Sequence, residues 1–144
     1  LIDCMPSLGI LTINALVAAD SVIIPCQTSY LPVKGLNQLL STISKVKRQL
    51  NRNLEVEGIL LTMVDIRNNY TKDMIFEIHD MYGNKEEIGT FGTYIPRSVR
   101  AEETTAQGVS IFKSRPECKI AEAYRSVAKE VIDHEREEET YTED

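Results

Sequence analysis

The stretch LIDCMPSLGILTINALVAADSVIIPC, residues 1–26, contains the segments from which a layered α/β domain is built. The first four residues are typical of the end of a buried strand, and a Pro-Ser-Leu-Gly turn follows them. Between Leu8 and Ala19 the apolar residues recur near the 3.6-residue period of a helix, and Ser7 stands where an N-cap would. After an Asp-Ser break, SVIIPC predicts a short strand. A strand, a helix and a strand in this order predict a parallel pair.

The same alternation continues to the end of the chain. After a loop QTSYLPVKG we expect a helix over 36–50, a strand over 56–64, a helix over 70–82, a strand over 90–95 and a helix over 117–134. Such a chain predicts an α/β fold with a doubly wound, mainly parallel sheet. We expect one domain over residues 1–134, and the acidic segment EREEETYTED, residues 135–144, as a disordered tail.

Composition narrows the class of protein. The 144 residues are 42% hydrophobic, which is typical of a globular domain, and no apolar run reaches the length of a membrane span. Three cysteines without a CxxC pair and two histidines offer few soft metal ligands, and they favour reduced cysteines in a cytoplasm. The net charge is −6, yet residues 21–54 hold five bases and no acid. We therefore expect a locally basic surface in an acidic protein.

Polar residues and prolines follow each predicted strand, at the edge where parallel sheets bind ligands. They are Asp3 and Pro6 after the first strand, Pro25 and Gln27 after the second, Asp65 after the third, and Pro96 and Arg97 after the fourth. An aspartate followed by a turn suits a magnesium-nucleotide site, and backbone N–H groups near Ser7 and Gly9 could face a phosphate. On these residues alone, a plain turn-capping role for Asp3 is an equal alternative.

Several motifs resemble one family in order. Residues 3–27 are similar to DxPPSLGxLTxNALxAADxVxIPxQ of the ParA/Soj partition ATPases, which are deviant-Walker P-loop proteins. The segments GLNQLLSTISKV, LEVEGILLTMVDIRNN, IPRSVRAEETTAQGVSI and IAEAYRSVAKEV resemble the later motifs of that family. Met5 replaces the first proline of DxPP, and Asn68 stands where the family often has threonine. The resemblance implies the C-terminal part of a P-loop NTPase sheet.

The resemblance also implies roles for particular residues. ATP and magnesium would be the cofactors of the intact parent, with Asp3 holding magnesium through water. Pro6, Ser7 and Gly9 match the turn that senses the γ-phosphate. The residues that match the adenine-binding wall are Thr62, Met63, Pro96, Arg97 and Val99.

The KGGxGKT phosphate loop and the switch-I aspartate of the family do not occur in these residues. In the family they lie ahead of the segment that matches Leu1, so we expect the chain to be a fragment of a longer ATPase. Without that loop, the β- and γ-phosphates lose their backbone nest and lysine. The expectation is that the chain alone binds no nucleotide, contains no complete catalytic set and does not hydrolyse ATP.

The partners implied by the family are a second copy of the chain, DNA bound without sequence preference, and a centromere-binding ParB-type protein. The family also implies a location in the cytoplasm, at the nucleoid. Clustered bases bind DNA phosphates, and the candidates are Lys45, Lys47, Arg48, Arg52, Lys85 and Arg100. An exposed strand edge near Asp3 predicts a dimer or a strand-exchanged oligomer.

Two alternatives remain open at this point. One is a non-enzymatic DNA- or partner-binding module, which the basic segment motivates. The other is a MinD-like ATPase that positions cell division. The PSLG and IPRSVR motifs argue against the MinD-like alternative, and so does an acidic C-terminal end in place of a basic amphipathic membrane helix. No membrane partner is expected.

Overall fold

The structure is a computed structural model of the chain, and it describes residues 1–5, 7–28, 30–83 and 88–142. Two strands and six helices lie in these residues. In chain order they are α1 (Ile10–Ala18), β1 (Ser21–Gln27), α2 (Tyr30–Gln49), β2 (Glu55–Thr62), α3 (Asn69–Tyr82), α4 (Val99–Ala106), α5 (Ile111–Ser114) and α6 (Lys119–Thr142). None of the helices in the described ranges is long and apolar enough to cross a membrane.

The sheet is parallel, as the alternation of segments predicted. β1 pairs with β2 from Ser21 opposite Glu55 to Gln27 opposite Thr62. On the other side of β2, the described residues make two isolated parallel bridges, Ile59 to Thr90 and Val64 to Pro96. The α/β class with a parallel sheet is thus confirmed.

The strand expected over 90–95 is reduced to these bridges. The reason lies in the middle of the segment, where the N–H groups of Gly92 and Thr93 donate to the carboxylate of Glu130 on α6. A side chain therefore binds the backbone donors in this stretch, and a continuous ladder with β2 does not form.

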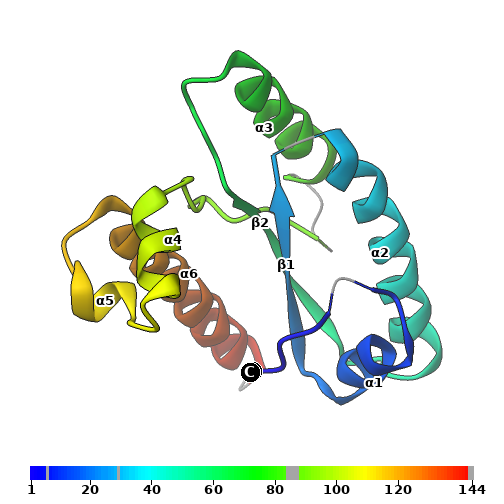
Figure 1. Cartoon of the computed structure of the whole chain (residues 1–144). Helices are drawn as coiled ribbons and strands as arrows, with labels where there is room; N and C mark the ends of the chain where they lie inside the picture. Colours follow the sequence, from blue (N-terminus) through cyan, green and yellow to red (C-terminus); the bar gives the residue numbers. More distant parts are fainter. Residues whose placement is uncertain (6, 29, 84–87, 143–144) are drawn as a thin grey trace.

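Helices cover both faces of the strands, and the strand residues alternate between two apolar clusters. Ile24, Cys26, Ile59 and Leu61 pack with residues of α1, α2 and α3. Leu60 belongs to the opposite cluster with buried Phe91, Ile95, Ile120 and Val127, and the partly buried Ile23 packs against that cluster. Figure 1 shows α4, α5 and α6 together across the strands from α2. This is a doubly wound arrangement, with both faces of the strands buried.

One extra residue interrupts the pairing of β1 with β2. Val22 lies opposite Val56 and Ile23 lies opposite Gly58, so Glu57 has no partner in the register. Gly58 takes φ 143°, where L side chains are rarely found, and a Cβ there would come 3.3 Å from Cδ2 of Phe91. A β-bulge at a glycine results.

The N-terminal segment differs most from the sequence prediction. Residues 1–5 form no strand in the described part of the chain, and Leu1, Ile2 and Met5 are exposed. A strand needs a neighbour for its backbone groups, and in the described residues the sheet consists of β1 and β2 alone. The helix expected from Leu8 begins at Ile10, with Gly9 as N-cap instead of Ser7.

The other helices match the periodicity more closely. α2 begins at Tyr30 and includes residues predicted to be loop; Pro32 lies in its first turn, where a missing N–H costs nothing. α3 agrees with its prediction and is capped by the Asn68 side chain, which accepts from the N–H of Tyr70. The short helices α4 and α5 were not predicted, and α6 continues through residues 135–142 of the acidic segment expected to be disordered.

Candidate functional site

The carboxyl ends of β1 and β2 form the edge of the sheet at which we expected a ligand. Their last paired residues are Gln27 and Thr62. The 95–97 segment is fixed beside the end of β2 by backbone hydrogen bonds: the N–H of Val64 donates to the carbonyl of Ile95 at 3.1 Å, and the N–H of Arg97 donates to the carbonyl of Val64 at 3.0 Å.

Four of the five predicted adenine-wall residues therefore come together from two distant segments. Thr62 is the last residue of β2 and Met63 follows it, while Pro96 and Arg97 both pair with Val64, the next residue of that stretch. The fifth, Val99, is exposed at the start of α4. Proline and methionine offer apolar surface, and an arginine offers a planar cation, so this edge has the chemistry to hold a flat, anionic ligand.

The backbone at this edge turns sharply. Met63 has φ 54°, and it is the non-glycine residue with positive φ in the described part of the chain. Such a conformation costs on the order of 1 kcal/mol for a side chain of this kind. It leaves Met63 exposed at the surface while Leu61 and Val64 stay buried.

Asp65 and Arg67 form an ion pair immediately after β2. The Nε of Arg67 donates to Oδ1 of Asp65 at 2.9 Å, and the Nη2 donates to Oδ2 at 2.8 Å. Hydrogen bonds from the Arg67 side chain and backbone, with a smaller contribution from the charge of Arg97, lower the pKa of Asp65 to about 2. Asp65 is therefore ionised at neutral pH, and the two arginines make the edge cationic. Sequence reasoning did not single out Arg67, although its place two residues after a strand-end aspartate was a usable signal.

The predicted magnesium and γ-phosphate residues belong to the segment that precedes α1. Asp3, Ser7 and Gly9 are exposed on the irregular segment ahead of α1, and Pro6 lies outside the described residues. The carbonyl of Ser7 accepts from the hydroxyl of Thr12 at 2.6 Å, which ties this segment to α1. In the described ranges no three His, Cys, Asp or Glu side chains gather as a metal site. One exposed carboxylate fits magnesium only as a single ligand beside phosphates.

The basic candidates fall into two groups on opposite sides of the strands. Lys45, Lys47 and Arg48 are exposed near the end of α2, and Arg52 follows in the next turn. Arg100 lies on α4, whose Ala101 packs in the cluster with α6. Lys85 lies outside the described residues. The structure therefore does not bring the whole predicted DNA-binding set together.

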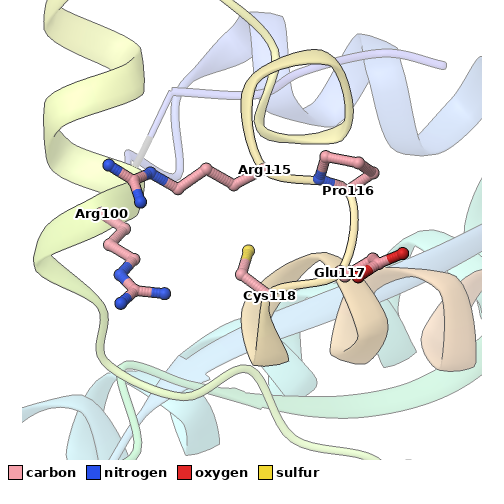
Figure 2. A pocket seen from close by; sticks show the side chains of 5 residues that line it. All are labelled: Arg100, Arg115, Pro116, Glu117 and Cys118. Atoms are coloured by element: carbon pink, nitrogen blue, oxygen red, sulfur yellow. The ribbon is translucent and has the colours of Figure 1, made fainter.

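Arg100 instead shares a shallow pocket with a second arginine. The pocket measures about 300 Å³ and is lined by Arg100, Arg115, Pro116, Glu117 and Cys118. Figure 2 shows both arginine side chains reaching over the same side of it, the Cys118 thiol pointing into it, and Glu117 turned away. The pocket adjoins the first turn of α6, where the carbonyl of Cys118 accepts from the N–H of Glu122. Two cations beside a helix N-terminus are favourable to an anion.

Comparison with known proteins shows which proteins the chain is similar to. A family profile described as AAA domain matches residues 1–56. The chain is 46% identical to the sporulation initiation inhibitor protein Soj of Bacillus subtilis over 131 residues, which are 91% of this chain and 50% of Soj. It is 39% identical to the chromosome partitioning protein ParA of Caulobacter vibrioides over 136 residues, covering 94% of this chain and 49% of ParA.

A solved structure agrees with these relatives. Cobyrinic acid a,c-diamide synthase from Mycobacterium smegmatis, with bound ATP analogue and magnesium, matches with a TM-score of 0.73 and 35% identity over 92% of this chain and 46% of that one. The chain spans about half the length of the curated relatives it matches. Over nearly its whole length, the chain belongs to the ParA/Soj family of chromosome-partitioning ATPases.

Proposed function

We propose that the chain supplies the base-binding edge and DNA-facing surfaces of a ParA/Soj-type partition ATPase that uses ATP and magnesium. The observation that carries the proposal is the pairing of Val64, which directly follows Thr62 and Met63, with Pro96 and Arg97 at the carboxyl edge of the sheet. An adenine would lie against Met63 and Pro96, and Arg97 would face the negative charge of the nucleotide.

The phosphate end of the site belongs to the same proposal. Asp3 would hold magnesium through water, and the turn with Pro6, Ser7 and Gly9 would approach the γ-phosphate. These groups act only beside a phosphate-binding loop, because the transition-state charge otherwise lacks its donors. The chain alone is therefore proposed not to hydrolyse ATP.

A chimeric protein tests this assignment. The part of Bacillus subtilis Soj that precedes its matched segment is fused ahead of Leu1, and magnesium-dependent ATP hydrolysis is measured. We expect the chimera to hydrolyse ATP and the Asp3→Asn chimera to lose about a hundredfold in rate, as expected when stabilisation of the transferred phosphoryl group is removed.

The matched control is Asp73→Asn, which changes an exposed aspartate on α3. Its rate should stay within about twofold of the unchanged chimera, since surface changes away from a site have small effects. Full activity in the Asp3→Asn chimera would remove Asp3 from the site. No activity in a folded, unchanged chimera would overturn the proposal.

DNA binding through the Arg100–Arg115 pocket is the second part of the proposed function. Both arginines are exposed, they flank a pocket at the start of α6, and Glu117 points away from them. A DNA phosphate placed there would meet two guanidinium groups and the positive end of the helix. The exposed bases at the end of α2 would form a separate contact on the other side of the sheet. This part could also operate in a chain that has no ATPase activity.

The proposed DNA contact at the Arg100–Arg115 pocket is tested by measuring how the affinity for duplex DNA depends on salt concentration. For Arg115→Gln we expect weaker binding to any sequence and a slope of log K against log salt that is smaller by about 1, because one phosphate contact is lost. Lys129→Gln removes the same charge from an exposed site on α6 away from the pocket and should leave the slope unchanged. Equal changes in both variants would show that only net charge matters and would contradict a local contact.

Family membership alone supports the remaining partners. We propose that the whole protein acts in the cytoplasm at the nucleoid, dimerises, and meets a ParB-type centromere-binding protein.

A further inference from the structure

Glu130 is the side chain through which α6 holds the 90–97 segment. It lies half-buried on α6, and its two carboxylate oxygens accept from consecutive backbone N–H groups. The N–H of Gly92 donates to Oε2 and that of Thr93 donates to Oε1, each at 2.9 Å, from a residue more than thirty positions away in the chain. Hydrogen bonds to a carboxylate are stronger than those between neutral groups.

This carboxylate occupies a gap in the pairing with β2. Before it, the N–H of Phe91 donates to the carbonyl of Ile59 at 3.1 Å, and after it, the N–H of Ile95 donates to the carbonyl of Leu61 at 2.8 Å. Between these points the backbone has left β2 and is bound to α6. Glu130 therefore fixes the part of the segment that the sheet leaves unsupported.

A second contact one helical turn later supports the same arrangement. The His134 ring lies 6.2 Å from the ring of buried Phe91, and its Nδ1 is 3.6 Å from Oε2 of Glu57 on β2. Residues four apart lie on one face of a helix. That face of α6 thus contacts both the segment and β2 at the point where the segment begins.

We propose that Glu130 is a positioning residue for the base-binding edge. Its carboxylate sets the path of residues 91–95, and that path places Pro96 and Arg97 beside the end of β2. The inference rests on the proposed function insofar as the edge binds a nucleotide, whereas the positioning itself can be tested in the 144-residue chain without any ligand.

The first test is amide NMR on the intact chain with a graded series, Glu130→Gln and Glu130→Ala. Gln keeps one accepting oxygen and Ala keeps none. We expect the amide protons of Gly92 and Thr93 to move upfield, and their hydrogen exchange to quicken by about tenfold or more in the Ala variant. The decisive amides are those of Ile95 and Arg97, whose exchange should also quicken, with Gln intermediate between Glu and Ala.

Glu135→Gln is the matched control, since it changes an exposed glutamate farther along α6. It should leave all four amides unchanged. Faster exchange at Gly92 and Thr93 with unchanged exchange at Ile95 and Arg97 would overturn the proposal, because Glu130 would then be a local contact only. If the Ala variant fails to fold, the Gln variant, which retains an acceptor, decides by the same criterion.

The second test uses the Soj chimera described above and Mg-ADP as the probe. Glu130→Gln should weaken ADP binding severalfold, while Glu135→Gln should not. If the unchanged chimera binds no ADP, the proposed function of the edge fails, and the exchange data still judge the positioning role. If it binds ADP and Glu130→Gln has no effect on affinity, the positioning proposal fails and the proposed function stands.

Discussion

The Asp65–Arg67 pair is the best-defined electrostatic feature of the candidate edge. The pair changes the pKa of Asp65, and the direction of that change determines how the pair affects stability as pH varies. Hydrogen bonds from Arg67 lower the pKa of Asp65 in the folded chain from 3.8 to about 2. A lowered carboxyl pKa stabilises the fold at pH values above the unfolded pKa, and this contribution is lost as pH falls from about 4 through about 2. Because Asp65 and Arg67 are solvent-accessible, the contribution to stability is small.

The pKa itself is the sharper prediction. In Arg67→Gln the hydrogen bonds from the guanidinium are lost, so the pKa of Asp65 should rise from about 2 toward 3.8. The backbone N–H of residue 67, which donates to Asp65, and to a smaller extent the charge of Arg97, still lower this pKa. The ¹³C chemical shift of the Asp65 carboxyl carbon is followed from about pH 1.5 to about pH 6, a range that includes both the usual and the lowered carboxyl pKa. The midpoint of this titration gives the pKa of Asp65. Arg48→Gln, an exposed arginine on α2, should leave the midpoint in place. An unchanged midpoint in Arg67→Gln would contradict the pair.

Single residues at the edge were only partly predictable. A strand-end aspartate at Asp65 and a Pro-Arg turn at Pro96 are visible in the sequence, because strand ends and prolines are local signals. The positive φ of Met63 is not, since it follows from pairing of Val64 with a segment about thirty residues away. Glu130 gave no signal either, because a carboxylate that binds two distant backbone N–H groups looks like any other charge on a helix.

At the scale of elements, α1 depends on a side chain from beyond α2. The Nδ2 of Asn51 donates to the carbonyls of Leu16 at 3.1 Å and Ala19 at 2.8 Å. These are carbonyls at the end of α1 that have no later helical turn to bind. Asn51 thereby joins the end of α1 to the turn that precedes β2.

Replacing this amide should destabilise the chain. We expect Asn51→Ala to lower the free energy of unfolding by about 1–2 kcal/mol, because two partly buried carbonyls lose a donor. Urea unfolding followed by circular dichroism measures it. Asn53→Ala removes an exposed amide from the same turn and should cost less than about 0.5 kcal/mol. Equal losses in the two variants would show that the capping bonds contribute little.

Elements with a long periodic or apolar run were predicted better than short helices and than a segment without a neighbouring strand. α3 is recognisable from period and capping, and β1 and β2 from their β-branched and apolar runs. Residues 1–4 have the composition of a strand, yet composition cannot supply the neighbouring strand that would hold them. α4 and α5 are short, and α5 has only four residues, so periodicity had little to detect.

At the scale of the whole molecule, apolar surface is concentrated at the N-terminal side. Ile10 and Leu11 on α1 are exposed to 68% and 67%, and Leu1 and Ile2 ahead of them are exposed as well. In the described sheet no strand lies along the outer edge of β1. An open edge and an exposed apolar helix face favour association with another chain.

We therefore predict self-association of the 144-residue chain at concentrations on the order of tens of micromolar. Sedimentation equilibrium should show species larger than the monomer, and Leu11→Lys should shift them toward monomer by placing a charge in the apolar surface. Phe76→Lys, at an exposed position on α3, is the control and should not. A stable monomer for the unchanged chain would contradict the prediction.

The bulge in β2 has a consequence for how chain length can vary. Leu54 and Val56 before it, and Ile59 and Leu61 after it, all pack in one cluster, although strict alternation would turn one pair over. The fold has in effect absorbed an insertion. Deleting Glu57 would restore a regular ladder and leave all four side chains facing this cluster. Deleting Leu60 would instead turn the side chains before it to the opposite face of the sheet, relative to those after it. Gaps in alignments of related chains should therefore fall at Glu57 or Gly58 and spare residues 59–62.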